Sequence, residues 1–352
     1  MPTDTGQLPQ TPSRLRHEAD ATLPPHTAML VPTPTVSVII PTYNAGPRFG
    51  ELLTRLQRQT HAPQEIIVVD STSRDDTAAI ARRAGAIVLE LPQAEFDHGG
   101  TRNMAAARAE GDVLLFMTQD AMPADEHLIA HLIAPLVEAD VACAYARQLP
   151  YADADPLERM ARAFNYPAQP QRKRADDLPR LGLKTFFCSN VCAAVRRHRF
   201  HALGGFAAPV IFNEDLFLAA TAVLDGYAIH YAAEAQVYHS HGYTLTQHFR
   251  RFFDNGVSMR SNAWIYPYAK VGKEGGRLVR AQLQQLRRER RWHWMPRLIG
   301  ESAAKWLGYQ LGKRYTRLPR AWCARMSMHR RIWDKLQRQP ARAEPGGVSM
   351  RE

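Results

Sequence analysis

The stretch Gly111–Pro123, GDVLLFMTQDAMP, decides how the rest of this sequence is interpreted. Its apolar run Val113–Met117 is typical of a strand buried on both faces. The run ends at Thr118-Gln119-Asp120, and we expect Pro123 to open a helix. Open α/β sheets bind ligands at the carboxyl ends of their strands, so the position of Asp120 indicates a binding site. Asp is also a common N-cap residue, and a capping role for Asp120 is the alternative.

Further apolar runs of strand length lie on both sides of this stretch, at Val36–Ile40, Glu65–Asp70, Ala86–Leu89 and Val141–Ala146. Pro41 is expected to end the first of these strands, because proline has no N–H to donate. Helical patterns separate the strands, among them an Ala-rich run at Thr101–Ala109. This alternation predicts an α/β fold with a doubly wound, mostly parallel sheet.

Three nucleotide and hydrolase signatures are missing from the sequence. No GxGxxG follows the first strand, and neither GxxxxGK[ST] nor GxSxG occurs. The sequence therefore does not favour a dinucleotide-binding dehydrogenase, a P-loop enzyme or a serine hydrolase of the elbow type.

The second half of the chain is less regular. Residues 151–180 are polar and rich in proline, which indicates an exposed connection with a short helix near Pro156–Phe164. Asn213 is expected to cap a helix whose first turn holds Glu214 and Asp215, where acids suit the helix dipole. Asp75 or Asp76 is expected to cap the helix after the second strand.

Composition and charge limit the class of protein. The chain has 352 residues, 45% of them hydrophobic, which suits one large domain or two modest ones. The 45 Lys and Arg against 34 Asp and Glu give a net charge of +11. From Lys270 onward the net charge is about +15, so the excess is concentrated in the last part of the chain. Such a tail suggests a polyanionic partner, either nucleic acid or anionic lipid.

The cysteines and the N-terminus indicate a cytoplasmic protein. The four cysteines, at 143, 188, 192 and 323, have no metal-finger or CxxC spacing, and we expect reduced thiols. The first twenty residues have no apolar signal core, and no window approaches the length of a membrane span. Residues 1–35, rich in Pro and Thr, are expected to be disordered.

Several acidic and histidine residues fall at strand ends or helix starts, namely Asp70, Asp120, Asp215, His239 and His241. Each has a simpler interpretation: Asp70 as a turn residue, Asp215 as a helix-start acid, and the two histidines as a solvated pair sharing one face of a strand. Because strand ends in a doubly wound sheet open onto one edge, their conjunction favours a common site.

An ordered set of motifs runs through the chain: VSVIIPTYN (36–44), EIIVVDSTSRDDT (65–77), FDHGGTRN (96–103), LLFMTQDAMP (114–123), FFCSNVCAAVRR (186–197), NEDLFLA (213–219) and VYHSHGYTL (237–245). Together these motifs resemble the inverting glycosyltransferases of family 2, which have the GT-A fold, and within them the bacterial rhamnosyltransferase branch. The resemblance covers residues 36–263. The usual metal motif is Asp-x-Asp, and here Thr118 takes the place of the first Asp.

The resemblance implies a nucleotide-sugar site whose residues are Pro41, Thr42, Tyr43, Asn44, Asp70, Arg102, Gln119 and Asp120. Arg102 would meet the base or a phosphate, which a guanidinium can bind with two parallel hydrogen bonds. The alternative for Arg102 is a surface charge on a helix. Asp120 would bind Mn²⁺ or Mg²⁺ together with His239 or His241, and imidazole suits Mn²⁺ better. Such a cation neutralises the charge of the departing diphosphate.

By the same resemblance, Asp215 is the general base that removes the proton of the attacking hydroxyl. Partial burial beside Glu214 would raise the pKa of Asp215 and make it a stronger base. Ser189, Asn190 and Glu214 would lie on the acceptor side. Attack opposite the leaving group inverts the anomeric carbon, with no covalent enzyme intermediate.

The tail, residues 264–338, is expected to be a basic helical region with interleaved tryptophans. Leu298, Ala303, Trp306 and Leu307 are expected to form one apolar face, which suits a helix lying in a membrane interface. The alternative is a helical cap packed on the catalytic domain. Residues 339–352 are expected to be disordered.

The resemblance thus implies a metal-dependent transferase that moves a sugar, best L-rhamnose from dTDP-L-rhamnose, to a cell-surface glycan acceptor that is lipid-linked. It would work in the cytoplasm, peripherally on the inner face of the cell membrane. Within the class, the alternative donor is another dTDP- or UDP-sugar. A nucleic-acid-binding protein is the alternative from another class, and no known nucleic-acid motif supports it.

Overall fold

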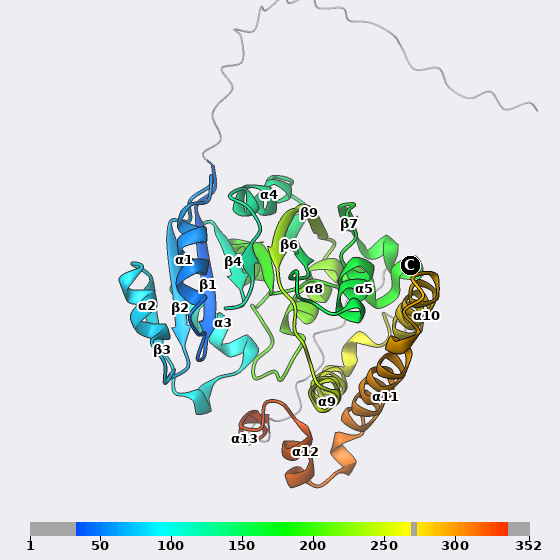
Figure 1. Cartoon of the computed structure of the whole chain (residues 1–352). Coiled ribbons are helices and arrows are strands. Elements are labelled where there is room, and N and C mark those ends of the chain that lie inside the picture. Colours follow the sequence, from blue (N-terminus) through cyan, green and yellow to red (C-terminus); the bar gives the residue numbers. More distant parts are fainter. Residues whose placement is uncertain (1–32, 269–272, 337–352) are drawn as a thin grey trace, which may run out of the picture. The chain divides into compact units, whose positions relative to one another are not determined.

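A nine-stranded sheet organises the computed structural model, which describes residues 33–268 and 273–336 (Figure 1). The strand order is β3-β2-β1-β4-β8-β6-β9-β5, and β7 pairs with β9. The strands are β1 Val36–Thr42, β2 Glu65–Asp70, β3 Ile87–Glu90, β4 Val113–Met117, β5 Met122–Pro123, β6 Val141–Leu149, β7 Gln171–Lys173, β8 Cys192–Arg196 and β9 Ala228–Tyr238.

The prediction of a mostly parallel sheet holds only for part of it. Strands β3, β2, β1 and β4 are parallel to one another, and so are β6 and β9. The other four pairings, β4–β8, β6–β8, β5–β9 and β7–β9, are antiparallel. The sheet is therefore mixed, because β8 enters between β4 and β6 in the opposite direction.

Both faces of the sheet are covered by helices, as a doubly wound fold requires. Alternate residues of β1 point to opposite faces: Val38 and Ile40 pack in one core and Ile39 in the other. The first core is closed by α1 Phe49–Gln57, α2 Thr77–Arg83 and α4 Leu128–Ile133. The second is closed by α3 His98–Ala106, α7 Arg197–Ala202 and α8 Glu214–Leu224.

Two prolines do not have the roles expected of them. Strand β1 continues through Pro41, which pairs with Val69 of β2, and ends at Thr42. Pro123 opens no helix: it belongs to the two-residue strand β5, and α4 begins only at Leu128. The conformation of this segment is set by its pairing with β9, a long-range contact that the presence of Pro123 alone cannot predict.

The expected helix caps are correct in position but not in detail. Asn213 precedes α8, but it has a left-handed backbone with φ 67° and its side chain makes no capping hydrogen bond. At α2 the Asp75 carboxylate accepts hydrogen bonds from the backbone N–H and the hydroxyl of Thr77. A helix near Pro156–Phe164 is confirmed as α5 Pro156–Asn165.

The terminal segments predicted to be disordered, residues 1–35 and 339–352, lie outside the described residues except for positions 33–35. Thr35 contradicts that prediction, because its N–H and hydroxyl both donate to the Asp112 carboxylate, at 3.0 and 2.9 Å. All four cysteines are buried free thiols.

The C-terminal part is helical, with α9 Leu245–Ser261, α10 Lys273–Arg288, α11 Met295–Gly312, α12 Arg320–Met326 and α13 Ile332–Leu336. No described helix has both the length and the hydropathy of a membrane span. Helix α11 packs closely along α9, where glycines at 256, 308 and 312 let the two backbones meet. The expected single apolar face on α11 is wrong for Leu298, which is buried, whereas Trp306 and Leu307 are exposed.

Helix α6 Leu178–Leu181 and the 3₁₀ helix η4 Gly182–Phe186 lead into β8. The predicted division into domains at residue 263 stays a prediction. The described residues of the tail nevertheless contact the rest of the chain extensively, through α11 on α9 and α10 on α5.

Candidate active site

A pocket of about 340 Å³ lies where β4 and β9 end and α8 begins. Asp120, His239 and His241 line one part of it, and Asp215 and Glu214 line another. Segments far apart along the chain thus place a potential cation site and a potential base around one cavity, as the predicted convergence of strand ends requires.

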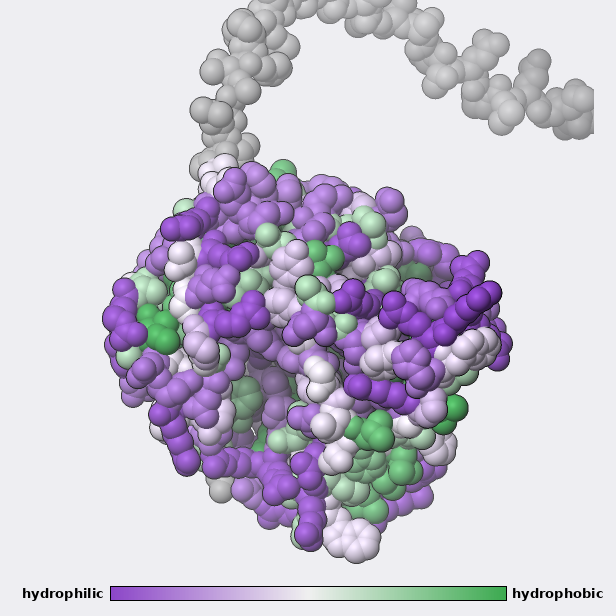
Figure 2. Space-filling view, in the orientation of Figure 1, coloured by the Kyte–Doolittle hydropathy of each residue, from purple (hydrophilic) through white to green (hydrophobic). Residues whose placement is uncertain are grey.

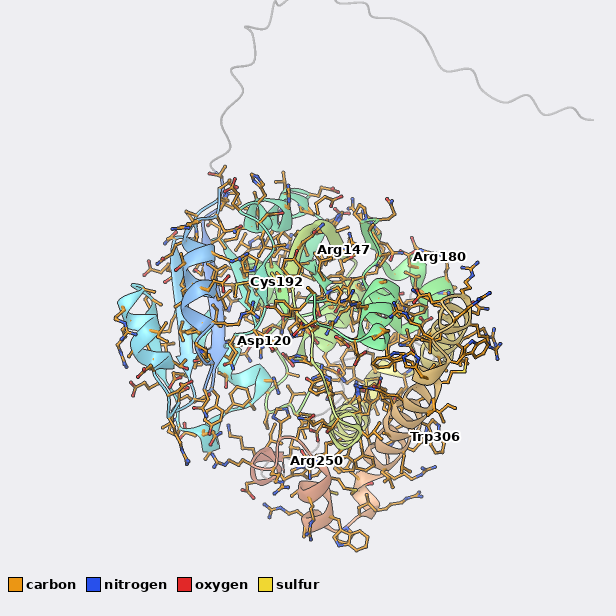
Figure 3. The ribbon with its side chains drawn as sticks, viewed as in Figure 1. Asp120, Arg147, Arg180, Cys192, Arg250 and Trp306 are labelled. Atoms are coloured by element: carbon orange, nitrogen blue, oxygen red, sulfur yellow. The ribbon has the colours of Figure 1, made fainter. Side chains whose placement is uncertain are left out.

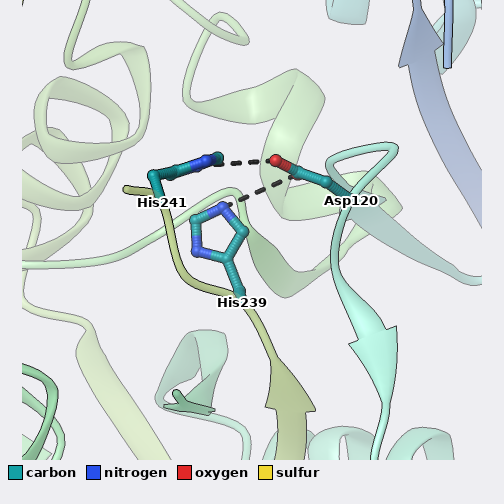
Figure 4. Close-up of side chains that lie close together, drawn as sticks. All are labelled: Asp120, His239 and His241. Atoms are coloured by element: carbon teal, nitrogen blue, oxygen red, sulfur yellow. Dashed lines mark ion pairs between the residues drawn. The ribbon is translucent and has the colours of Figure 1, made fainter. Parts of the chain in front are cut away.

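The register of a short strand pair explains how Asp120 meets the histidines. Met122 of β5 pairs with Tyr238 of β9 in antiparallel orientation. Asp120 lies just before β5 and the histidines just after β9, so the three side chains leave the sheet at the same place (Figure 4). The histidines do not lie on the strand, as had been expected, because β9 ends at Tyr238. They nevertheless point at the same carboxylate.

The triad has the geometry of a cation site. The Nε2 atoms of His239 and His241 lie 3.6 and 3.5 Å from the two Asp120 oxygens, and the three ligand atoms lie within 4.8 Å of one another. Ligands of one ion at ~2.1 Å stand roughly 3 to 3.5 Å apart, which matches the two Asp120–histidine distances, so these residues could hold a divalent cation such as Mn²⁺. Burial raises the pKa of Asp120, but the hydrogen bond and charge of His239 outweigh this and hold it well below its usual range.

A second layer of contacts fixes the orientation of His239. The amide nitrogen of Gln148 donates to the hydroxyls of Tyr166 and Ser189, at 2.6 and 2.9 Å, which leaves its oxygen toward Arg162 and His239. The Nδ1 of His239 lies 3.0 Å from that oxygen, so Nδ1 carries the proton. With Nδ1 donating to Gln148, Nε2 can present its lone pair to a cation bound between it and Asp120. Such support of the distal nitrogen is typical of histidines that bind metal.

Asp215 occupies the first turn of α8 and is held from both sides. One carboxylate oxygen accepts the N–H of Asn190 at 2.9 Å, and the other accepts the N–H of Leu216 at 2.8 Å. Burial and the neighbouring charge of Glu214 raise the pKa of Asp215 to about 7, although both N–H bonds and Arg102 oppose the shift. The expected rise through burial beside Glu214 is therefore present.

Arg102 is not a surface charge, because it is only 4% exposed. It donates to the carbonyl of His98 at 2.9 Å and lies 3.3 Å from the Glu214 carboxylate. The guanidinium thereby neutralises the acid next to Asp215 and joins α3 to α8. Its predicted contact with the donor stays a prediction.

The residues expected on the acceptor side all border the same cavity. Ser189 and Asn190 precede β8, and Glu214 opens α8. The Asn190 side chain donates to Glu214 at 3.1 Å while its backbone N–H holds Asp215. This segment therefore positions the acid pair directly.

Of the residues expected to bind the nucleotide, Arg102 and Asp120 line this pocket, and the others form a neighbouring group at the ends of β1, β2 and β4. The Gln119 side chain accepts the N–H of Tyr43 at 2.8 Å and donates to its carbonyl at 3.2 Å, which ties the Asp120 turn to the end of β1.

Asp70 is 3% exposed and accepts hydrogen bonds from Thr42 and Ser73, so its contacts are those of the turn residue named as the alternative. Tyr43 is exposed, and Asn44 binds Ser73 and Arg74 through its backbone and side chain. Pro41 and Thr42 are the last residues of β1.

Sequence reasoning missed several residues of the pocket, chiefly Gln148, Arg162, Tyr166, Arg251 and Asn255. Extending the predicted strand 141–146 to its true end would have placed Gln148 at the edge of the sheet. Arg251 and Asn255, one turn apart on α9, carried no motif.

Sequence reasoning also gave no role to Lys173, a buried residue that does not line the pocket. It is 1% exposed and has no carboxylate partner among the described residues. Its ammonium donates to the Tyr145 hydroxyl and to the carbonyls of Lys184 and Phe187, and burial lowers its pKa to about 8. The contacts fix the end of η4 just before Ser189.

The comparison with protein families now decides the class. Residues 37–204 match the family model described as "Glycosyl transferase family 2". A curated relative, the O-antigen chain rhamnosyltransferase WbaN of Salmonella anatum, is 42% identical over 307 residues, covering 86% of this chain and 97% of the relative. This chain belongs to glycosyl transferase family 2. A second curated relative, the O-antigen chain rhamnosyltransferase RfbN of Salmonella typhimurium, is 40% identical over 305 residues, with the same coverage of both chains.

Solved structures show the same fold at low identity. The mannosyltransferase PcManGT from Pyrobaculum calidifontis, solved in complex with GDP-Man and Mn²⁺, has 20% identity and a TM-score of 0.52, covering 86% of each chain. S. aureus TarS 1-349 has 19% identity and a TM-score of 0.51, covering 88% of this chain and 93% of its own. This family 2 glycosyltransferase therefore has the GT-A fold.

Proposed function

We propose that this family 2 enzyme is an inverting, metal-dependent rhamnosyltransferase. It would move L-rhamnose from dTDP-L-rhamnose to a hydroxyl of a growing cell-surface glycan. One observation carries the mechanism: Asp215 and the Asp120–His239–His241 triad line one pocket. The sugar is inferred from the two O-antigen chain rhamnosyltransferases, which match almost over their full length.

The roles of the residues follow from their chemistry. Asp120, His239 and His241 would hold Mn²⁺ or Mg²⁺, which would neutralise negative charge on the departing diphosphate. Asp215 accepts the proton of the acceptor hydroxyl as that oxygen attacks the anomeric carbon. A pKa of about 7 makes the Asp215 carboxylate a far stronger base than an ordinary aspartate while leaving it largely ionised above neutral pH. The attack displaces the diphosphate from the opposite face, so the configuration inverts.

The donor site is proposed to run from the triad to the ends of β1 and β2. Tyr43 and Asn44 are exposed there, and Gln119 connects them to Asp120. Arg102, together with the backbone of Pro41 and Thr42, would complete the site. Since the Asp70 carboxylate already accepts three protein hydrogen bonds, its contribution would be to hold this turn rather than to contact the base.

The purified protein tests the reaction directly. Incubated with dTDP-L-rhamnose, Mn²⁺ and a lipid-linked glycan acceptor, it is expected to add one deoxyhexose, seen by mass spectrometry, with an anomeric configuration opposite to the donor's by NMR. Equal or faster transfer from other dTDP- or UDP-sugars would overturn the donor assignment. Retention of configuration would overturn the mechanism, and unchanged activity in EDTA would overturn the role of the cation.

We further propose that the acceptor is lipid-linked and that the enzyme works peripherally on the inner face of the cell membrane. The support is the basic tail: positions 273–336 hold 17 Lys and Arg against 4 Asp and Glu, a net charge of about +13. Such a segment is attracted to anionic lipid. A tenfold higher rate with the lipid-linked acceptor than with the same glycan released from lipid is expected. Equal rates would argue against this part of the proposal.

A further inference from the structure

Helix α11 exposes an apolar face that no other part of the described chain covers. Ile299, Ala303, Trp306 and Leu307 follow one another at helical spacing and form what we call the outer face of α11. Ile299 and Trp306 are each 65% exposed and Leu307 is 47% exposed. Figure 2 shows hydrophobic residues gathered over this part of the surface.

The outer face is not needed for packing within the chain. The buried residues of α11, namely Leu298, Glu301, Gly308 and Gly312, lie on the other side of the helix, and the two glycines meet the backbone of α9. A helix docked only as a cap would have polar residues on its free side. A clustered apolar surface on the free side instead marks an interaction site.

Uncompensated positive charge borders the outer face at both ends. Arg290 lies just before the exposed Trp292, and Arg314 and Arg317 follow the last turn of α11. All three arginines are exposed, and none has an acidic partner within ion-pair distance among the described residues. A second copy of this chain would bring the same positive charge to the contact, which disfavours self-association. An anionic lipid surface supplies both an apolar layer and the opposite charge.

We infer that the outer face of α11 is the surface by which this protein docks on an anionic membrane. Helix α11 lies in the interface plane, with Ile299, Trp306 and Leu307 entering the boundary of the acyl chains and the arginines meeting lipid phosphates. The inference rests on the proposed membrane association and adds the surface and the orientation.

The orientation follows from the two sides of α9. Arg251 and Asn255 line the pocket, whereas Phe249, Phe253 and Gly256 face α11 on the opposite side of the helix. Pocket, α9, α11 and membrane therefore follow one another, and in Figure 3 the α9 helix lies between Asp120 and Trp306. Two helix layers separate the reacting carboxylate from the lipid by roughly 20 Å. A hydroxyl at the outer end of a lipid-linked glycan reaches that height, and one in the headgroup layer does not.

Vesicle co-sedimentation of the full chain tests the docking surface. The vesicles are phosphatidylcholine alone or with about one third phosphatidylglycerol, and the variant is Ile299→Asp/Trp306→Asp. Val137→Asp is the matched control, because Val137 is 77% exposed and lies in η2 Ala134–Val137, next to α4 and away from α11. We expect the wild type to bind the anionic vesicles, the double variant to lose at least tenfold in partition coefficient, and the control to bind like wild type.

Three results would overturn the inference. These are equal binding by wild type and double variant, no binding of the wild type to anionic vesicles, and a wild-type dimer in sedimentation velocity that the double variant abolishes. Rhamnose transfer to a lipid-free glycan is measured on the same samples. Because the outer face does not touch the pocket, this activity separates a wrong docking surface from a wrong enzyme assignment, and it also shows that the double variant is folded.

Discussion

Asp215 has to be shielded enough to act as a strong base and still be able to ionise. Its surroundings meet both conditions: burial and the charge of Glu214 raise its pKa, while hydrogen bonds from the N–H groups of Asn190 and Leu216 stabilise the anion. Arg102 compensates Glu214, so the acid pair does not share a full double charge in the protein interior.

Asp215→Asn is expected to lower kcat by about 10²- to 10⁴-fold, which is the usual contribution of a general base. Donor affinity, measured by isothermal titration with dTDP-L-rhamnose and Mn²⁺, should change little, because the triad is intact. In the wild type, kcat/KM should fall as the pH drops below about 7, where Asp215 becomes protonated. Loss of donor binding, or a flat profile down to pH 5, would remove Asp215 from the role of base.

The same substitution should affect stability in a pH-dependent way. The pKa of Asp215 is about 7 in the folded chain against 3.8 as its ordinary value, so between these limits the folded state holds a proton that the unfolded state has lost. Stability from this group is therefore lost as the pH rises, and the loss is complete above pH 7. Asparagine cannot ionise. The melting temperature of Asp215→Asn relative to wild type should be higher at pH 8 than at pH 4, and an equal difference at both would contradict the raised pKa.

Asp120→Ala should abolish the dependence of donor binding on the cation, because it removes the one carboxylate of the triad. Titration of dTDP with and without Mn²⁺ measures this. Asp125→Ala is a suitable control, since Asp125 lies in the following loop and is exposed, and its carboxylate accepts only the N–H of His127 among the described residues. If Mn²⁺ still strengthens dTDP binding to Asp120→Ala, the ion is held elsewhere.

At the scale of elements, the contact of α9 with α11 depends on the absence of side chains. A Cβ on Gly308 would lie 2.2 Å from the carbonyl oxygen of Phe249, and one on Gly312 would lie 2.1 Å from that of Phe253. Glycine is a poor helix former, so these glycines lower the intrinsic stability of α11, but they allow the backbones of α9 and α11 to approach closely.

Gly308→Ala should therefore destabilise the protein, by about 1–3 kcal/mol, because overpacking outweighs the gain of about 1 kcal/mol in helix propensity. Gly276→Ala in α10 is the matched control: nothing lies within 4 Å of its Cβ position, so the propensity gain should appear alone as a small stabilisation. Urea unfolding of both variants measures the change in the free energy of unfolding, which should be negative for Gly308→Ala and positive for Gly276→Ala. Equal effects would mean that α11 is not packed on α9 in solution.

Elements whose residues carry their own pattern were predictable from the sequence. The buried strands β1, β2 and β4 and the apolar face of α1 follow from local runs of Val, Ile and Leu. Strand β5 was not, because two residues have no period, and its pairing with Tyr238 depends on the whole sheet. The antiparallel direction of β8 was likewise not predictable, since a buried strand has the same apolar sequence pattern in either direction.

At the scale of the whole molecule, the site was predictable as a set of strand ends and motifs, but not as a cavity. Asp120, Asp215 and the two histidines were predicted because they fall at strand ends or at a helix start. Gln148, Arg162 and Arg251 have no such signal, and only the assembled fold shows that they face the same space. The hydrogen bonds of Asp70 were not predictable for the same reason: its partners Thr42 and Ser73 come together only when β1 and β2 are side by side.

The two-residue strand β5 joins the segment that holds Asp120 to the strand that precedes the two histidines. Because this pairing is so short, hydrogen exchange in β5 should be sensitive to ligand binding at the cation site. Its pairing with β9 is continued by the amide of Ala124, which donates to the carbonyl of Gln236 at 3.0 Å. A ligand that bridges Asp120 and the histidines adds a second connection between the same two segments, at the opposite end of β5 from Ala124, and so stabilises their pairing. Deuterium uptake at Ala124 should therefore slow when Mn²⁺ and dTDP are added together, while uptake in α7, which begins beside the start of β4 at the opposite edge of the sheet, stays constant. Ligand binding at the cation site would thus be measurable as less frequent opening of the hydrogen bonds between β5 and β9.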